Sequence, residues 1–250
     1  MNLKFYITLL ALFFSVINFV SCKTVPISDL TQEDGIARIK KNYEAKEWTE
    51  VINNVDEYKT RYPYSQYTQD ADLMQGDAYY QSDRYPEAIA VYEDFVRKNP
   101  THSQVALATY RISKCYDFQA PDNIDRDQAN SKKALDKFNY YIQNFPKTEW
   151  IDEAKQRREV LNRRIADHSE FIAQFYWKKD QYASALSRYL EILKSYSNYG
   201  DLVKLAKERA SLCYLELAKI LEKNPTSDAF VFFKNETPDT LKQKAVEIKN

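Results

Sequence analysis

One apolar frame recurs four times along this chain, and it constrains the fold more than any other feature of the sequence. In the clearest copy the members stand three, four and three positions apart: Tyr85, Ala88, Tyr92 and Phe95. Residues at these steps lie on one face of an α-helix. Pro86 falls in the first turn of that helix, where no backbone donor is required, and Pro100 lies beyond its end. The segment therefore predicts an amphipathic helix bounded by prolines.

The other three copies repeat this spacing. They are Trp48, Val51, Val55 and Tyr58 before Pro63; Ser131, Ala134, Phe138 and Tyr141 before Pro146; and Tyr182, Ala185, Tyr189 and Ile192 before Ser197. Aromatic residues of a preceding helix stand upstream of three copies, around Tyr43, around Tyr79 and Tyr80, and around Phe175 and Tyr176. The repeating unit is therefore a pair of helices with a small residue where they cross, which is the tetratricopeptide pattern.

These units predict an all-α fold, a tetratricopeptide-like superhelix of about five antiparallel helix pairs over residues 31–223. A pair of about 34 residues cannot bury its apolar face alone, so neighbouring pairs must stack. Successive copies begin 37, 46 and 51 residues apart, which indicates longer helices or inserted loops. The clearest insert spans residues 119–130, where Asp125 and Gln128 have the spacing of a capping box for the next helix.

Composition and motifs argue against several functional classes. The chain has 36 basic and 36 acidic side chains, so it lacks the positive field that nucleic-acid binding requires. Only three glycines occur, too few for glycine-rich phosphate loops and strained nucleophile elbows. The two histidines, His102 and His168, stand far apart and in no zinc-binding spacing. We therefore expect no catalytic residue, metal or cofactor, and the enzymatic alternative is a set of carboxylates assembled in space.

The N-terminus reads as a secretory signal over residues 1–21. Phe5 to Val20 is almost entirely apolar, with Lys4 before it and the small Ser21 before Cys22. The stretch resembles a bacterial lipoprotein signal in which residues 19–22 form the lipobox and Cys22 becomes the acylated first residue. Residues 22–30 would then be a lipidated tether. Because the apolar run is shorter than the roughly 20 residues that span a bilayer, a transmembrane anchor is the weaker alternative.

Two further cysteines and the C-terminal tail leave alternatives open. Cys115 and Cys213 lie in apolar helical windows, where each is expected to be a buried small hydrophobic residue, the alternative being a disulfide between them. The tail, residues 224–250, contains an apolar patch at 229–233 followed by a lysine-rich helical stretch. It either caps the last helix pair, whose outer face must be shielded, or docks on a partner.

Several segments together resemble a known family. In chain order they are the lipid-type signal, Tyr62-Pro63-Tyr64-Ser65, Ala78-Tyr79-Tyr80, Asn99-Pro100-Thr101-His102, Asp125-Arg126-Asp127 before Ala134, Phe145-Pro146-Lys147-Thr148, and Tyr176 followed by Tyr182-Ala183-Ser184-Ala185-Leu186-Ser187-Arg188. On these segments the chain resembles the outer membrane protein assembly factor BamD family, the tetratricopeptide-like lipoproteins of the β-barrel assembly machinery. The resemblance covers nearly the whole mature chain, apart from the tail.

The resemblance implies a non-catalytic scaffold, lipid-anchored on the periplasmic face of the bacterial outer membrane. Its partners would be the barrel-forming outer-membrane assembly protein, bound through its periplasmic modules, and unfolded outer-membrane proteins. Family members bind the barrel protein mainly through the C-terminal pairs, where Arg188 is the candidate contact. They bind substrate segments mainly through the N-terminal pairs, where the candidates are Arg61, Tyr62, Tyr64 and Tyr67.

Each candidate also has a purely structural interpretation. The tyrosines have the helical spacing of residues that pack between helices with the hydroxyl reaching water. Arg188 can pair with Glu191 on its own helix at little net gain. Arg126, between two aspartates, is a candidate partner contact, but it can equally clasp its loop or help to hold a cation. A calcium loop there would lack the required glycine and glutamate.

Two other non-enzymatic functions fit the same pattern. A general tetratricopeptide lipoprotein could serve wall-synthesis regulation, motility or pilus assembly in the cell envelope. A lipid-anchored carrier of a soluble ligand would need a closed apolar cavity in place of an open groove.

Overall fold

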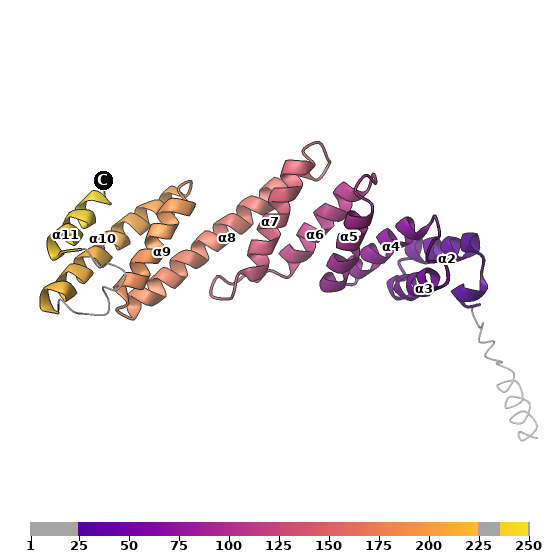
Figure 1. Cartoon of the computed structure of the whole chain (residues 1–250), viewed down its shortest axis with the longest axis horizontal. Coiled ribbons are helices and arrows are strands. Elements are labelled where there is room, and N and C mark those ends of the chain that lie inside the picture. The colour runs from indigo at the N-terminus through magenta and orange to yellow at the C-terminus, as the bar shows by residue number, and fades with distance from the viewer. Residues whose placement is uncertain (1–24, 225–235, 250) are drawn as a thin grey trace, which may run out of the picture.

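The structure is a computed structural model that describes residues 25–224 and 236–249. These ranges contain ten α-helices, one 3-10 turn and no strand. The elements are η1 (Ile27–Asp29), α2 (Gln32–Glu44), α3 (Trp48–Arg61), α4 (Thr68–Gln81), α5 (Tyr85–Lys98), α6 (Val105–Phe118), α7 (Ala129–Asn144), α8 (Ile151–Lys178), α9 (Tyr182–Ser195), α10 (Gly200–Lys223) and α11 (Pro238–Glu247). Consecutive helices pack in pairs that follow one another along an elongated array, from α2 at one end to α11 at the other (Figure 1). The predicted all-α stack of helix pairs is confirmed.

The repeated frame forms the core. Its inward positions on α3, α5, α7 and α9 are at most 1% exposed: Val51, Val55, Tyr58, Ala88, Tyr92, Phe95, Ser131, Ala134, Phe138, Tyr141, Ala185, Tyr189 and Ile192. All of them except Ser131 belong to four hydrophobic clusters spread along the array, each built by neighbouring helices. This distribution is expected of a solenoid, because each pair contacts only its neighbours.

Three helix pairs turn through a residue in the left-handed region. Lys46, Asp83 and Asp180 have φ values of 60°, 57° and 56°. Each donates its amide to a carbonyl three residues back and so closes the preceding helix, as a C-terminal glycine usually does. Aspartate tolerates this conformation better than most residues. In two of the turns its carboxylate also accepts a hydrogen bond from a tyrosine two residues on, Tyr85 at 2.6 Å and Tyr182 at 2.7 Å.

The insert after α6 differs from the sequence prediction. The capping box expected at Asp125 and Gln128 is wrong, because α7 begins at Ala129 and Gln128 makes no cap. The Gln128 amide instead donates to the carbonyls of Asn123 and Arg126, each at 3.0 Å, and so holds the loop closed. An Asx turn satisfies the first amide of the helix: Ala129 donates to the carboxylate of Asp127 at 2.7 Å.

Both ends of the array are covered by short segments. At the N-terminal end Ile27 is 1% exposed, and the amide of Ser28 donates to Glu57 of α3 at 2.8 Å, so residues 25–30 lie against the first pair. At the other end α11 buries Leu241 and Ala245 against α10, and the hydroxyl of Ser211 donates to the carbonyl of Ala245 at 2.7 Å.

The proposed signal peptide, Cys22 and the apolar patch at 229–233 lie outside the described residues. Within the described part, none of the helices combines the length and the apolar character needed to cross a bilayer. Cys115 and Cys213 are buried free thiols, as the sequence predicts.

Candidate protein-binding surfaces

The first helices of the three N-terminal pairs, α2, α4 and α6, border an open hollow of about 540 Å³, which we call the N-terminal groove. It is lined by Lys40, Tyr43, Asp70, Leu73, Met74, Asp77, His102, Ser103, Gln104, Leu107 and Arg111. This lining combines apolar side chains with both signs of charge. A groove of that kind can hold an extended peptide through apolar contacts and hydrogen bonds.

A buried polar network forms the floor of the N-terminal groove. The carboxylate of Asp77 accepts hydrogen bonds from the hydroxyls of Tyr43, at 2.6 Å, and Tyr92, and it pairs with Arg111. Arg111 also donates to the hydroxyl of Tyr92 at 3.1 Å and lies over the ring of Tyr80, 5.6 Å from its centroid. The network therefore ties α2, α4, α5 and α6 together at one carboxylate.

Burial shifts the protonation equilibria of this network. Desolvation raises the pKa of Tyr92 well above its usual value, so the phenol remains a neutral donor to Asp77. Desolvation also lowers the pKa of Arg111. The floor thus presents a fixed and internally paired set of charges.

His102 and an exposed ion pair lie at the rim of the groove. The Nδ1 atom of His102 accepts the amide of Gln104 at 3.1 Å, just before α6 begins, so its role is local capping. Lys40 of α2 and Asp70 of α4 approach to 3.4 Å with both side chains half exposed, which contributes little stability. These rim groups are therefore accessible to a ligand that enters the groove.

The predicted N-terminal candidates lie at the connection between α3 and α4 and do not line the N-terminal groove. Arg61 lies over the ring of Tyr62, 5.4 Å from the centroid, and the hydroxyl of Tyr62 donates to the carbonyl of Leu30. Tyr67 packs against the core of the first pair. Tyr64 is 99% exposed, whereas Tyr62 and Tyr67 are partly buried.

The two predicted partner-binding arginines lie in different settings. Arg188 on α9 donates to Glu191 at 2.9 Å, and both side chains are about half exposed, at 45% and 48%. Arg126 is exposed in the loop that Gln128 closes, and within the described part of the chain its guanidinium has no ion-pair partner. The structure does not bring these two arginines together.

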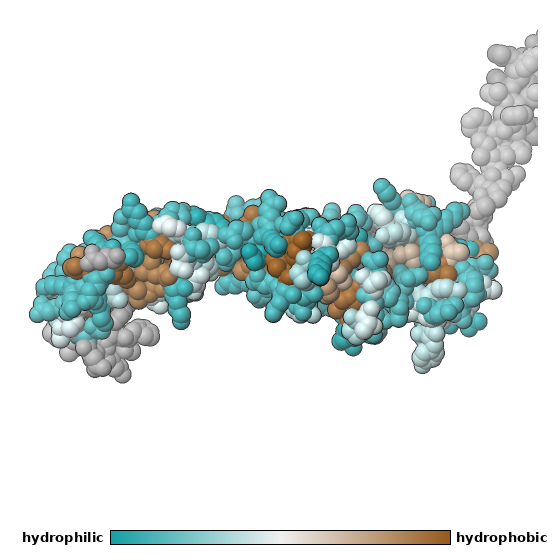
Figure 2. All heavy atoms as spheres, turned by 90° about the horizontal axis from the view of Figure 1, so that it is seen from above, coloured by the Kyte–Doolittle hydropathy of each residue, from teal (hydrophilic) through white to brown (hydrophobic). Residues whose placement is uncertain are grey.

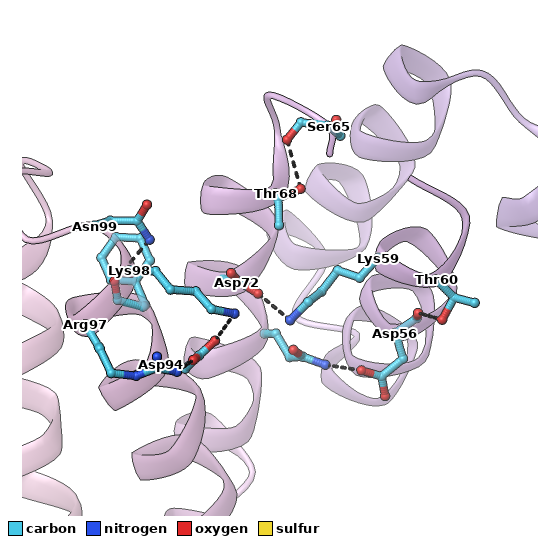
Figure 3. A network of polar contacts seen from close by, with 12 residues as sticks. Asp56, Lys59, Thr60, Ser65, Thr68, Asp72, Asp94, Arg97, Lys98 and Asn99 are labelled. Atoms are coloured by element: carbon cyan, nitrogen blue, oxygen red, sulfur yellow. Dashed lines mark hydrogen bonds and ion pairs between the residues drawn. The ribbon is translucent and has the colours of Figure 1, made fainter. Parts of the chain in front are cut away.

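Ion pairs connect successive helix pairs of the array. Lys59 of α3 points to the buried carboxylate of Asp72 on α4, and both belong to the polar network of Figure 3. Further along, Arg157 of α8 holds Asp117 of α6 through two nitrogens, at 2.7 and 2.8 Å, and the side chain of Asp117 is only 2% exposed. Bidentate geometry makes such a pair directional as well as attractive.

The face seen in Figure 2 is largely hydrophilic, and its apolar residues form separate patches along the long axis. Several exposed aromatic side chains are already engaged locally. Phe118, for example, stacks on Tyr85 with ring centroids 5.2 Å apart. Hydrophilic side chains separate the apolar patches on the face shown in Figure 2.

Comparison with known proteins identifies the family. The family model YfiO, described as outer membrane lipoprotein, matches residues 30–220, which is most of the chain. The chain belongs to the YfiO outer membrane lipoprotein family. A relative from Caulobacter vibrioides, named outer membrane protein assembly factor BamD, is 28% identical over 59% of this chain and 48% of its own. The protein of the same name from Vibrio cholerae is 27% identical over 60% of this chain and 66% of its own.

The matched part of this YfiO-family chain thus spans between about half and two thirds of those relatives. Among solved structures, the TPR2AB-domain:pHSP90 complex of yeast Sti1 superposes with a TM-score of 0.42 at 14% identity, over 86% of this chain and 98% of that one.

Sequence reasoning missed the floor of the N-terminal groove. The frame identified Tyr92 as a core residue but gave no sign that its hydroxyl meets Asp77 and Arg111, which lie on two other helices of this YfiO-family chain. One signal was available. Asp77 stands on the buried face of α4, and buried carboxylates are almost always paired.

Proposed function

We propose that the chain is a non-catalytic lipoprotein scaffold for the assembly of outer-membrane proteins. It would bind a barrel-forming outer-membrane protein through that protein's periplasmic modules, and it would bind unfolded outer-membrane proteins before their insertion. The observation that carries the proposal is the family match over residues 30–220, together with relatives whose name is outer membrane protein assembly factor. Acylated Cys22 would anchor the chain to the periplasmic face of the outer membrane.

The N-terminal groove is suited to a substrate segment. Tyr43, Met74 and Leu107 provide apolar surface, and the paired charges at Asp77 and Arg111 provide fixed donors and acceptors. An unfolded outer-membrane protein presents alternating apolar and polar side chains, which match such a mixed lining. Tyr64, with Arg61, Tyr62 and Tyr67 beside it, would extend this contact region along the first pair.

Arg188 is the proposed contact to the barrel-forming partner. Its only ion pair within the described part of the chain is the exposed one with Glu191, which is weak and easily exchanged for a partner's carboxylate. Arg126 is a second proposed contact, because it projects from a loop that is itself held rigid.

The experiment is affinity purification of the full-length lipoprotein from native membranes, with mass spectrometry of the proteins that co-purify. Recovery of an outer-membrane barrel protein that carries periplasmic modules is the expected result. Pilus, motility or wall-synthesis proteins in its place would overturn the assembly function and leave a general envelope scaffold.

A pair of variants localises the contact. Arg188→Glu should abolish recovery of the barrel protein, whereas Arg97→Glu should not, although Arg97 makes the same kind of exposed ion pair with Asp94 three residues away. Equal loss of the barrel protein in both variants would show that recovery depends on the overall charge of the chain and not on Arg188. Unchanged recovery with Arg188→Glu would remove that residue from the interface.

A further inference from the structure

Two three-helix segments of the array share a set of side-chain features, and we call them the first and the second copy. The segment α4–α5–α6 and the segment α8–α9–α10 share an arginine over an aromatic ring, at 5.6 Å for Arg111 on Tyr80 and 5.8 Å for Arg209 on Trp177. They also share the left-handed aspartate turn, the tyrosine that bonds to that aspartate, and a buried cysteine four residues after the arginine on the third helix. The corresponding residues are Asp83 and Asp180, Tyr85 and Tyr182, Tyr92 and Tyr189, and Cys115 and Cys213.

The two copies differ at the residue that carries the charge. In the first copy Asp77 stands three residues before Tyr80 and joins Tyr92 to Arg111. Three residues before Trp177 the second copy has Gln174, which donates its amide to Glu170 on its own helix. The aligned position therefore holds no carboxylate.

In the second copy, Tyr189 and Arg209 therefore lack the carboxylate that Tyr92 and Arg111 share in the first copy. The hydroxyl of Tyr189 is completely buried and has no hydrogen-bond partner in the described part of the chain. Arg209 is half-buried, and no carboxylate of the described residues lies within ion-pair distance of it. A buried hydroxyl without a partner is uncommon in native structures and calls for a specific explanation. Here the missing partner is the acceptor that Asp77 supplies in the first copy.

We propose that the surface of α8 and α10 around Arg209 binds a carboxylate side chain of a partner protein, in the role that Asp77 plays in the first copy. The partner's Asp or Glu accepts a hydrogen bond from the guanidinium of Arg209, which lies over the ring of Trp177. The Gln174 side chain then turns away from Glu170, and the hydroxyl of Tyr189 donates to the partner's carboxylate.

The charges around Tyr189 favour a partner's carboxylate at the position where the first copy has Asp77. Burial, with a smaller contribution from Glu170 of α8, raises the pKa of the Tyr189 phenol to about 12. Glu170 is already held by Gln174 and does not reach the hydroxyl. The charge of Arg209 lowers the same pKa, and Arg209 has no ion-pair partner among the described residues. The inference holds for any acidic partner and does not rest on the assembly function.

Two peptides test the proposal on the full-length chain. A fluorescein-labelled Gly-Phe-Glu-Phe-Gly peptide should bind about tenfold more tightly than its Gly-Phe-Gln-Phe-Gly counterpart, since a charge-assisted contact is lost with glutamine. The difference should disappear in Arg209→Gln and persist in Arg97→Gln, which removes an exposed arginine that pairs with Asp94. Equal binding of the two peptides to the wild-type chain, or an unchanged preference in Arg209→Gln, would overturn the proposal.

A third variant separates the site from a general effect on folding. Gln174→Asp restores the internal carboxylate, so it should raise the melting temperature and at the same time weaken the glutamate peptide about tenfold. Arg209→Gln should weaken the same peptide without raising the melting temperature. A Gln174→Asp chain that binds the peptide as well as the wild type would show that the carboxylate does not occupy this position.

Discussion

Gly76 lies so close to the ring of Tyr92 that a Cβ added at Gly76 would stand 2.6 Å from the Cε1 atom of the tyrosine. The contact brings α4 and α5 together at their crossing and places the hydroxyl of Tyr92 at Asp77. It explains why Gly76 is inside a helix, where glycine is otherwise unfavourable.

Gly76→Ala should therefore destabilise the protein, despite the better helix propensity of alanine. Overpacking a closed contact costs about 1–3 kcal/mol, and the propensity gain returns at most about 1 kcal/mol. The measurement is the free energy of unfolding in urea. Gly200→Ala is the control, because a Cβ at Gly200 meets nothing within 4 Å. A stabilised Gly76→Ala chain would contradict the packing described above.

The hydroxyls of Tyr92 and Tyr189 should differ in their contribution to stability. Tyr92→Phe removes hydrogen bonds to the charged Asp77 and Arg111, which cost about 1.5–3 kcal/mol to lose. Tyr189→Phe removes a buried hydroxyl that has no partner within the described residues, so its free energy of unfolding should be unchanged or slightly higher. Urea unfolding of the two variants measures the difference directly. Equal losses in both would mean that the hydroxyl of Tyr189 is bonded in solution.

Burial of the two thiols predicts a loss of stability at alkaline pH. Desolvation raises the pKa of both Cys115 and Cys213 to about 12 from an ordinary value of 9.0. A raised pKa means that the folded state binds the thiol protons more tightly than the unfolded state does. The resulting contribution to the free energy of unfolding is fully present below pH 9 and is lost as the pH rises from 9 toward 12.

Thermal unfolding from pH 7 to 11 tests this expectation, and a Cys115→Ala, Cys213→Ala double variant should show a shallower decline above pH 9. The native thiols should also resist alkylation at pH 8 and react once the chain is unfolded. Rapid alkylation of the native chain would place the thiols at the surface.

The fold was predictable because the apolar residues of each helix recur with helical spacing. The spacing of Tyr85, Ala88, Tyr92 and Phe95 is sufficient to define a buried helix face, and each of the last three is at most 1% exposed. The turn at Asp83 was not predicted, because a left-handed aspartate leaves no glycine in the sequence to mark it. The capping box failed for a related reason: Gln128 found acceptors within its own loop that the spacing rule does not consider.

The candidate surfaces were less predictable, because their polar groups meet across helices. Asp77, Tyr92 and Arg111 belong to three helices, and nothing in the local pattern of any one of them specifies the other two. Comparison of the two structural copies supplies what the pattern lacks, since it aligns Asp77 with Gln174 and shows which charge is absent. The roles of Arg188, Arg126 and the aromatic group around Tyr64 remain proposals for experiment.

The short helix α11 should stabilise the last pair by covering α10. Leu241 is fully buried there, so Leu241→Ala should cost about 2–5 kcal/mol of the free energy of unfolding. Val246 is on the same helix but 64% exposed, and Val246→Ala should change stability by no more than about 0.5 kcal/mol. Truncation after Asn224 should lower the melting temperature in the same direction as Leu241→Ala, because both remove the cover from α10. An unchanged melting temperature together with lost partner binding would instead make the tail a docking segment, since a segment that holds a partner need not stabilise the free chain.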